Sequence, residues 1–508
     1  MNIANIKLET MKFYVTTPIY YVNDVPHIGH AYTTISADII ARFKRMCGYK
    51  VFFLTGTDEH GKKIEKAAQE KGVTPKELAD TTHQRFKELW KRLNISYDKF
   101  IRTTDQEHQE AVKYFWLKIK KNIYKSKYKG WYCIPCETFV PSSQIGEQET
   151  CPTCGRKLEF LEEESYFLST SEHKENLRRY IKEHDVIKPD FRRNEILNAI
   201  DDLQDISISR PSSRVSWGVR VPDDESQTIY VWFDALINYI SAIGYPKPME
   251  FWPADIHIVG KDILKFHSII WPIMLMSAGL ELPKKIFAHG WWKVKGQKMS
   301  KSLKNVVDPF ELSKVFKEDT VRFFLFREIP FGNDGDFSDE LILKRYENDL
   351  AKDIGNLFLR VSKFSETNFP DGVRKSGNLN FAEINLSNIL DDWIKSMSEL
   401  DFYSALNLMF QVVSYANRYM DIKAPWKSLK IGNREEAQKI IYDLCYLIKV
   451  ILYMLYPFCP STSTEVSEKF GIKIEKSKSE EDLKKDILVG YEIFKVSSTG
   501  VLFPKIEG

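Results

Sequence analysis

Two short motifs in this chain of 508 residues combine residue types that suit phosphate chemistry, and the first is His27-Ile28-Gly29-His30. It follows a β-rich run and opens a helical pattern. Backbone N–H groups at a helix N-terminus are unpaired and attract phosphate oxygens. Gly29 lets a nucleotide approach the backbone closely, and the His27 and His30 imidazoles can donate hydrogen bonds to a triphosphate. Taken alone, the pattern fits an accidental surface pair of histidines better.

The second motif is Lys298-Met299-Ser300-Lys301-Ser302, which we expect in a loop after the last strand of a sheet. Lysines on a mobile loop can close over a pyrophosphate leaving group and stabilise the negative charge that grows in the transition state. We therefore predict Lys298 and Lys301 as catalytic residues. A basic surface loop explains this motif equally well when it is considered alone.

A third set of residues suits metal binding, because four cysteines form two neighbouring CxxC pairs, Cys133 with Cys136 and Cys151 with Cys154. Each CxxC turn presents two thiolates, and two such turns make the tetrahedral sulfur cage that structural Zn²⁺ prefers. A closed cage leaves no ligand position for a substrate, so the sequence predicts one structural zinc ion that folds this segment. Two disulfides are the alternative, which a reducing cytosol disfavours.

The order of the apolar patterns predicts the elements that must position these motifs. Residues 13–17 and 51–54 have the composition of strands on either side of a helical pattern at 29–46, which indicates a parallel α/β sheet. From about residue 120 to residue 220 this rhythm breaks, as expected for an inserted module. The α/β pattern resumes at residues 229–233, 256–259, 264–277 (a helix) and 286–288.

Long helical patterns dominate beyond about Asp319. Residues 403–420 and 436–455 carry apolar side chains at three- and four-residue steps, which predicts a helix bundle. Residues 473–486 are rich in charge, and we expect a weakly structured connector there.

Composition limits the class of protein and of partner. A hydrophobic fraction of 43% excludes wholesale disorder, and the net charge of only +3 means that a nucleic acid would have to be met by local patches. The lysine-rich stretch from Lys113 to Lys129 is one candidate patch, and a solvated helix face is the alternative. The apolar runs are too short to span a membrane and no secretory signal precedes the first motif, so we expect a cytoplasmic protein.

Taken together, the two phosphate motifs resemble the signature pair of the class I aminoacyl-tRNA synthetases. Longer blocks are similar to the methionyl-tRNA synthetase family, in its bacterial type with a single four-cysteine zinc knuckle insert. These blocks are residues 16–23 (TTPIYYVN), 55–61 (TGTDEHG), 230–235 (YVWFDA) and 259–263 (VGKDI). The resemblance covers nearly the whole chain from about Lys12, and the long blocks are far more specific than either short motif.

The resemblance implies a site for Mg·ATP and for L-methionine. Asp58 matches the carboxylate that receives the substrate ammonium. The implied ATP-binding residues are His27, Gly29, His30, Gly260, Lys261, Asp262 and Lys301. The implied methionine-binding residues are Ile19, Tyr21, Asp58, Trp232, Ala235, Tyr239, Ile263, His267 and Trp271. Aromatic walls suit a thioether, although a stripe such as Ile263, His267 and Trp271 is by itself more typical of core. Leu236 stands where the family sometimes has proline, which leaves the exact pocket shape open.

The C-terminal helices resemble the anticodon-binding bundle of the same family. By that resemblance Asn356 and Arg360 read anticodon base edges and Trp426 stacks on a base, whereas Trp426 alone would more often be a packing residue. The expected RNA partner is tRNA(Met). Since the extra dimerising domain of many relatives does not follow Gly508, we expect a monomer.

The resulting fold prediction is α/β: a Rossmann-type parallel sheet split by a zinc-containing insert and followed by an all-α helix bundle. The predicted domains are residues 11–119 and 226–325 (the two catalytic halves), 120–225 (the insert), 326–365 (a helical link) and 366–508 (the anticodon-binding bundle). A synthetase for another amino acid and an RNA-binding paralogue without activity are the rival hypotheses. The short insert disfavours the first, and the intact histidines and lysines disfavour the second.

Overall fold

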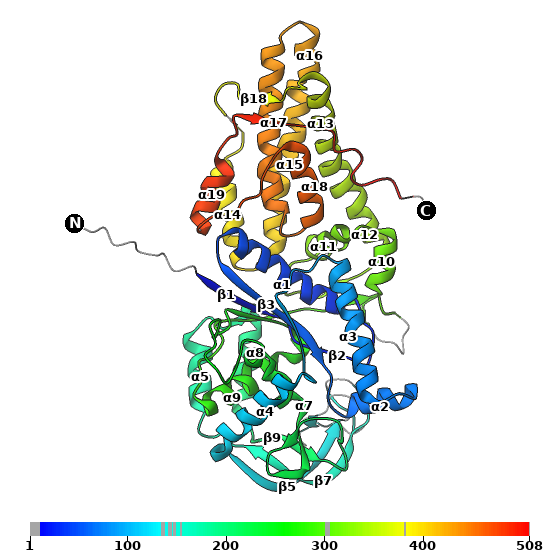
Figure 1. Ribbon diagram of the computed structural model, residues 1–508, viewed down its shortest axis with the longest axis vertical. Helices are drawn as coiled ribbons and strands as arrows, with labels where there is room; N and C mark the ends of the chain where they lie inside the picture. The colour runs from blue at the N-terminus through cyan, green and yellow to red at the C-terminus, as the bar shows by residue number, and fades with distance from the viewer. Residues whose placement is uncertain are drawn as a thin grey trace, which may run out of the picture.

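The computed structural model describes residues 11–506, apart from 134–137, 141–144, 146–148, 153–154, 300–304, 380 and 382. Figure 1 shows an elongated molecule with a helical bundle at one end, a sheet across the middle and a smaller module with its own strands at the other end. The helix α1 (Ile28–Met46) lies between the sheet and the bundle.

The central sheet is parallel at every described strand pair, which confirms the predicted α/β class. Its strand order is β2-β3-β1-β13-β14-β8, with β4 beside β3. Apolar residues dominate the middle strands because helices cover both faces. The strands are β1 (Lys12–Thr16), β2 (Tyr20–Tyr21), β3 (Lys50–Asp58), β4 (Lys99–Arg102), β8 (Ile187–Lys188), β13 (Ile256–Gly260) and β14 (Ile286–His289).

The segment between the two halves of the sheet forms antiparallel hairpins. The long strands β5 (Ile123–Cys133) and β7 (Glu159–Leu168) pair along their whole length. The expected insert is not wholly separate from the catalytic sheet, however, because β8 leaves it and pairs with β14 in parallel. The other strands of this region are β6 (Thr138–Val140), β9 (Ile206–Ser207), β10 (Ser209–Pro211), β11 (Arg220–Val221) and β12 (Asp224–Ile229).

The lysine-rich stretch does not form a continuous basic surface. It is divided between α4 (Gln106–Lys118) and β5, and acidic residues pair with part of it. Lys125 lies 3.0 Å from an Asp224 carboxylate oxygen, and Lys129 lies 2.8 Å from Glu162. The structure therefore favours the solvated-face interpretation.

Two expected elements differ in the structure. Residues 229–233 do not form one strand, because β12 ends at Ile229 and the helix α7 (Val231–Leu236) begins at once. The expected helix over 264–277 is present as one continuous helical stretch, but it contains a π-helical turn, η5 (Phe266–Ile270), before α9 (Trp271–Ala278), and it continues from the short turn η4 (Lys261–Ile263). Pro272 accounts for the wider turn, since it has no N–H to donate to the preceding turn.

The remaining helices of the catalytic half and of the region between its two parts cover the sheet and its edges. They are α2 (Lys62–Lys71), α3 (Pro75–Arg92), η1 (Lys120–Asn122), α5 (Lys174–Glu183), η3 (Asp190–Arg192), α6 (Arg193–Asp201) and α8 (Asn238–Ser241). The lysine motif begins in a small sheet of β15 (Trp292–Val294), β16 (Gln297–Lys298) and β17 (Gly335–Asp336), and Lys298 is the last residue of β16.

The helix bundle is confirmed, and its two long helices closely match the predicted ranges. The expectation of a weakly structured connector at 473–486 was wrong in part. Ser479 caps the helix α19 (Glu480–Leu488) in this segment, and Leu483 and Ile487 of that helix are buried. The helices beyond the sheet are α10 (Pro309–Val315), α11 (Glu318–Arg327), α12 (Asp339–Arg345), η7 (Tyr346–Gly355), α13 (Asn356–Asn368), α14 (Leu386–Ser398), α15 (Phe402–Lys423), α16 (Pro425–Lys430), α17 (Arg434–Leu455), α18 (Pro460–Phe470) and α19 (Glu480–Leu488). The short strands β18 (Val373–Arg374) and β19 (Ile493–Phe494) pair beside them. Within the described ranges, every helix is too short or too polar to cross a bilayer.

Candidate active site

The strand order defines where a ligand can bind. β1 lies in the middle of the sheet, with β3 on one side and β13 on the other, so the chain turns outward in opposite directions at this pair. In such sheets a crevice opens at the carboxyl ends of the two strands. The first histidine motif follows β1, and Gly260-Lys261-Asp262 follows β13. The fold therefore brings these two predicted sites to one crevice.

The histidine motif forms the N-terminal cap of α1. The Gly29 N–H donates to His27 Nδ1 at 3.1 Å, and the His27 N–H donates to His30 Nδ1 at 3.1 Å. The two rings stack with centroids 3.8 Å apart. Since both Nδ1 atoms accept hydrogen bonds, each neutral ring carries its proton on Nε2. Burial, then His27 and then Lys63 hold the pKa of His30 well below its usual value, so this ring is a neutral donor at physiological pH.

Gly29 is required by the cap itself. A Cβ atom at this position would lie 2.9 Å from His27 Cε1 and 3.0 Å from His27 Nδ1. A larger residue would therefore displace the ring that accepts the Gly29 N–H. The absence of a side chain at Gly29 therefore leaves the His27 ring in its capping position and leaves the backbone of the first turn of α1 uncovered.

Of the lysine motif, the structure describes the backbone of Lys298 and Met299, and the chain is described again from Asn305 onward. β16 ends at Lys298 and forms a hairpin with β15, and Lys301 lies outside the described residues. On the far side of the motif, the Ile28 N–H donates to the Val307 carbonyl at 3.1 Å. The chain leaving the lysine motif thus contacts the residue between His27 and Gly29. This contact puts the exit of the loop at the N-terminus of α1, as the shared-site hypothesis requires.

The Gly260-Lys261-Asp262 segment is held beside the crevice by polar contacts. Lys261 Nζ donates to both carboxylate oxygens of Asp334, at 2.7 and 2.8 Å. Asp262 Oδ1 accepts a hydrogen bond from Trp291 Nε1 at 3.1 Å. A Cβ atom at Gly260 would lie 2.7 Å from that same Asp262 oxygen, so the glycine lets the carboxylate fold back over the strand end.

The predicted methionine residues gather on the other side of β13. Tyr239, His267 and Trp271 are fully buried, and Ile19, Tyr21, Trp232 and Ile263 pack partly buried against the same apolar cluster. His267 Nδ1 donates to the Ile263 carbonyl at 3.0 Å, so its Nε2 accepts the Tyr239 hydroxyl at 2.7 Å. Burial lowers the pKa of His267 to about 4, which keeps it neutral. Ala235 lies buried on α7, the helix that also carries Trp232.

Two aromatic residues of this cluster were not predicted from the sequence. Phe266 stacks on Trp232 with ring centroids 3.8 Å apart, and His257 lies 4.3 Å from the Tyr239 ring. His257 Nδ1 also shares a hydrogen bond of 2.7 Å with Thr16 Oγ1, which joins β13 to β1. Their positions beside the 259–263 block were the only sequence signal that could have found them.

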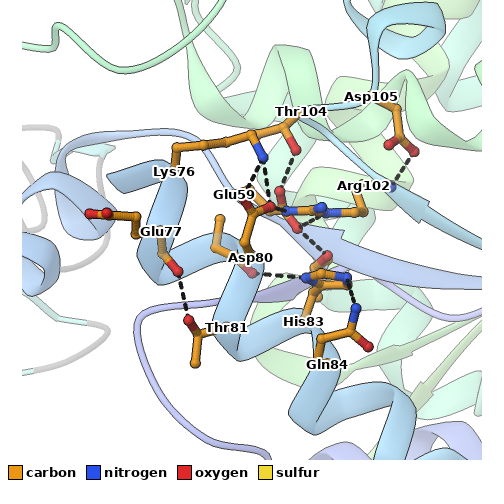
Figure 2. A network of polar contacts seen from close by, with 12 residues as sticks. Glu59, Lys76, Glu77, Asp80, Thr81, His83, Gln84, Arg102, Thr104 and Asp105 are labelled. Carbon is orange, nitrogen blue, oxygen red and sulfur yellow. Dashed lines mark hydrogen bonds and ion pairs between the residues drawn. The ribbon is translucent and has the colours of Figure 1, made fainter. Parts of the chain in front are cut away.

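Asp58 is buried at the carboxyl end of β3, directly beside Tyr21 in the strand register. The next residue, Glu59, is fully buried and accepts hydrogen bonds from Arg102 Nε and Thr57 Oγ1, both at 2.7 Å. Figure 2 shows Arg102 between Glu59 and Asp80, with Lys76 at the outer end of the network. This ion network connects β3 to β4 and α3 and fixes the strand end that carries Asp58.

A second buried network joins the two catalytic halves. Asp234 Oδ2 lies 2.7 Å from His60 Nδ1, and Asp234 Oδ1 lies 3.0 Å from His108 Nε2. Burial raises the pKa of Asp234, but His60 and His108 more than offset it and lower the pKa to about 2. The carboxylate therefore stays ionised and ties the end of β3 to α7, the helix that carries Trp232 and Ala235.

Comparison with known proteins agrees with this geometry. The family model described as "tRNA synthetases class I (M)" matches residues 13–362, and the one described as "Anticodon binding domain of methionyl tRNA ligase" matches residues 369–508. The chain belongs to the methionyl-tRNA ligase family of class I tRNA synthetases. Its activity is the ligation of methionine to tRNA.

Individual relatives are similar over almost the whole chain. The Methionine–tRNA ligase of Thermotoga maritima is 45% identical, covering 98% of this chain and 81% of that protein. The Methionine–tRNA ligase of Rickettsia felis is 42% identical, covering 98% of this chain and 99% of that protein. The solved Mycobacterium tuberculosis methionyl-tRNA synthetase in complex with methionyl-adenylate superposes with a TM-score of 0.91 at 36% identity, covering 98% of this chain and all of the other.

The residues predicted to read the anticodon lie in the bundle of this ligase, away from the sheet. Asn356 is exposed on α13, and Arg360 Nη2 donates to Asp421 Oδ1 at 2.6 Å near the end of α15. Trp426 follows on α16, at the tip of the bundle in Figure 1, with 42% of its surface exposed. That exposure is more than a helix-end packing residue needs. The ion pair and the short α15–α16 connection bring all three towards one end of the bundle.

Two of the four predicted zinc ligands can be placed. Cys133 and Cys151 are buried in one small cluster with Val140 and Leu158. The Gly155 N–H donates to the Cys151 carbonyl at 2.8 Å, which closes a tight turn after that cysteine. Cys136 and Cys154 lie outside the described residues. The described residues include only Cys133 and Cys151 of the four cysteines, and among the described residues no three His, Cys, Asp or Glu side chains cluster as a metal site.

The Glu59–Arg102 network makes a prediction. Replacing Arg102 by Met keeps an apolar stem but leaves the Glu59 charge buried without its cation, which costs roughly 3–5 kcal/mol. We expect a lower thermal midpoint and weaker methionine binding, because the strand end that carries Asp58 loosens. Thermal unfolding and a fluorescence titration with methionine measure the two effects.

Lys76→Met is the matched control, since it changes the outer end of the same network, where the side chain is 52% exposed. It should alter neither quantity much. If the Arg102→Met enzyme is destabilised but binds methionine with unchanged affinity, the network contributes to stability and not to the methionine site.

Proposed function

We propose that this ligase activates L-methionine with Mg·ATP in the crevice between β1 and β13 and then esterifies tRNA(Met). The observation that carries the proposal is the Ile28–Val307 hydrogen bond, which brings the exit of the lysine motif to the capped N-terminus of α1. A methionyl-adenylate bound to the Mycobacterium tuberculosis neighbour supports the same intermediate here.

Activation is an in-line displacement. A methionine carboxylate oxygen attacks the α-phosphorus of ATP, a new phosphorus–oxygen bond forms, and the bond to pyrophosphate breaks with its electron pair leaving on the pyrophosphate. No side chain acts as nucleophile, so catalysis consists of positioning and charge stabilisation. A terminal ribose hydroxyl of tRNA then attacks the carbonyl of the mixed anhydride and releases AMP.

The family resemblance and the positions of the described residues support the following roles. The Nε2–H groups of His27 and His30 donate to the triphosphate, and Lys298 and Lys301 neutralise the departing pyrophosphate. Gly260, Lys261 and Asp262 contact the adenosine beside the end of β13. Asp58 receives the methionine ammonium, since a cation entering a buried pocket needs a carboxylate partner.

The side chain of methionine enters the cluster of Ile19, Tyr21, Trp232, Ala235, Tyr239, Ile263, His267 and Trp271. A polarizable thioether gains from contacts with aromatic rings, and two neutral tips, the Tyr239 hydroxyl and the His267 imidazole, satisfy each other inside the pocket. Because these two polar groups are hydrogen-bonded to each other, neither needs a polar partner from the substrate. This arrangement suits an unbranched, uncharged side chain.

We propose that Cys133, Cys136, Cys151 and Cys154 hold one structural zinc ion. The support is that Cys133 and Cys151, one from each CxxC pair, lie buried in the same cluster, and that Gly155 has a φ of +70° in the turn after the second pair. The metal would hold the two turns together and thereby fold the tip of the β5–β7 hairpin.

The activation proposal is tested by ATP–pyrophosphate exchange. The wild-type enzyme should exchange with methionine and with no other amino acid at comparable concentration. Lys301→Ala should slow exchange on the order of 100-fold, because a charge that acts on the transition state is lost, while methionine affinity changes little. Lys314→Ala, an exposed lysine on α10 paired with Glu311, is the control. Undiminished exchange in Lys301→Ala would remove the lysine motif from the mechanism.

The zinc proposal is tested by metal analysis of the purified protein. Wild type should contain about one zinc per chain, and Cys133→Ser should lose most of it because three thiolates make a weaker cage. Cys47→Ser changes a cysteine of the main core and should retain the metal. A wild-type protein purified without chelators that holds no zinc would refute the cage.

The anticodon assignment predicts a separation of the two half-reactions. Trp426→Ala should leave exchange unchanged and raise the KM for tRNA(Met) by roughly 10-fold or more, since base stacking contributes about 1–3 kcal/mol. Val489→Ala, an exposed apolar residue after α19, should leave both reactions alone. Equal losses of exchange and aminoacylation in Trp426→Ala would contradict a role at the anticodon.

A further inference from the structure

The helix α2 begins directly after the 55–61 block and carries lysines that point in different directions. Lys62 and Lys66, one helical turn apart, line a groove between α2 and the β5–β7 hairpin together with Arg214. Lys62 also pairs with Glu65 at 2.9 Å. Lys63 is turned away from that groove, and its Nζ lies 4.4 Å from the centroid of the Tyr21 ring. Lys63 therefore lies against Tyr21, one of the predicted methionine-binding residues, and is not among the residues that line the groove.

The surroundings of Lys63 place it between the two substrates. Tyr21 is paired in register with Asp58, the residue that we assign to the methionine ammonium. On the other side, the Lys63 ammonium contributes, after burial and His27, to the lowered pKa of His30 in the phosphate-binding cap. Lys63 thus contacts a predicted methionine-binding residue and is close enough to the phosphate-binding cap to act on His30.

The start of α2 is held firmly, so the location of Lys63 is defined. The Gly61 N–H donates to the Trp217 carbonyl at 2.9 Å, and the Gly61 φ of +99° is one that side-chain-bearing residues rarely adopt. The Trp217 indole N–H donates in return to the Glu59 carbonyl at 2.5 Å. Half-burial of the Lys63 side chain further restricts where its ammonium can go.

The chemistry of activation favours a protein cation at this junction, in addition to the magnesium ion that accompanies ATP. A carboxylate must approach a triphosphate, and both are negatively charged. The neutral His30 ring supplies a hydrogen bond but no charge, and the Lys261 ammonium is bonded to both oxygens of Asp334. The lysine motif is assigned to the leaving pyrophosphate, at the opposite side of the α-phosphorus from the attacking oxygen.

We propose that Lys63 is a further catalytic residue of the activation step, donating from Nζ to a non-bridging α-phosphate oxygen while the methionine carboxylate attacks. This inference rests on the proposed function of the crevice. Lys63 forms no covalent bond and keeps its proton. It lowers the repulsion between the two anions and stabilises the phosphoryl charge in the transition state.

The test compares Lys63→Met, Lys63→Arg and the matched control Lys66→Met in the full-length enzyme. Single-turnover formation of methionyl-adenylate should slow on the order of 100-fold in Lys63→Met, and the methionine dissociation constant and thermal midpoint should stay close to wild type. Lys63→Arg keeps the charge and should recover part of the rate. Lys66→Met should behave as wild type, because its side chain faces the groove.

Wild-type adenylate formation in Lys63→Met would overturn the inference. So would a slow Lys63→Arg enzyme indistinguishable from Lys63→Met, since the charge would then be irrelevant. A lowered thermal midpoint in Lys63→Met would be resolved with Lys63→Gln, in which a slow rate at normal stability supports the inference and a normal rate refutes it. A wild-type enzyme without methionine-dependent exchange would instead refute the proposed function, so the two failures are distinguishable.

Discussion

The arrangement of the whole ligase depends on one buried ion cluster at the middle of α1. Asp38 is fully buried and accepts hydrogen bonds from Arg42 Nε and from the Ser96 N–H, while Arg322 Nη2 lies 2.7 Å from the same carboxylate. Burial raises the pKa of Asp38, but the two guanidinium groups more than offset it and lower the pKa to about 2. Each ion depends on the others, because an unpaired charge at this depth would cost several kcal/mol.

Arg322 extends this cluster into the helix bundle. It lies on α11 and donates to the Phe458 and Pro457 carbonyls after α17 and to the Leu93 carbonyl after α3. One side chain therefore satisfies carbonyl groups from the catalytic half and from the bundle. The capped histidines begin the same α1 helix that Asp38 anchors, so the phosphate site and the bundle that carries the proposed anticodon residues share one rigid joint. A ligase that binds one tRNA at two distant points needs such a fixed separation.

Local patterns predicted much of this fold, whereas contacts between distant residues were not predictable. The periodicity of α1, α15 and α17 and the strand–helix–strand order were sufficient for the class and the bundle, because those signals lie within one element. The edge strand β8, the Asp38–Arg322 pair and the Asp234 network each join segments far apart in sequence, and no local pattern marks them. The π-helical turn before Trp271 is different, since Pro272 was visible in the sequence and its missing N–H was the cause.

The site residues were predicted mainly from resemblance, and the structure adds the electrostatics that a motif cannot contain. The letters of the first motif do not reveal that both rings accept hydrogen bonds at Nδ1, which makes them neutral Nε2–H donors. Neutral donors can orient a triphosphate without attracting the wrong anion strongly, but they leave its charge uncompensated. Beyond the magnesium ion that accompanies ATP, compensation by the protein must therefore come from ammonium groups placed around the histidines, and the tertiary fold decides their position. The uncharged histidine cap thus supplies hydrogen bonds and the surrounding lysines supply charge, and this arrangement depends on the folded crevice and cannot be read from either motif alone.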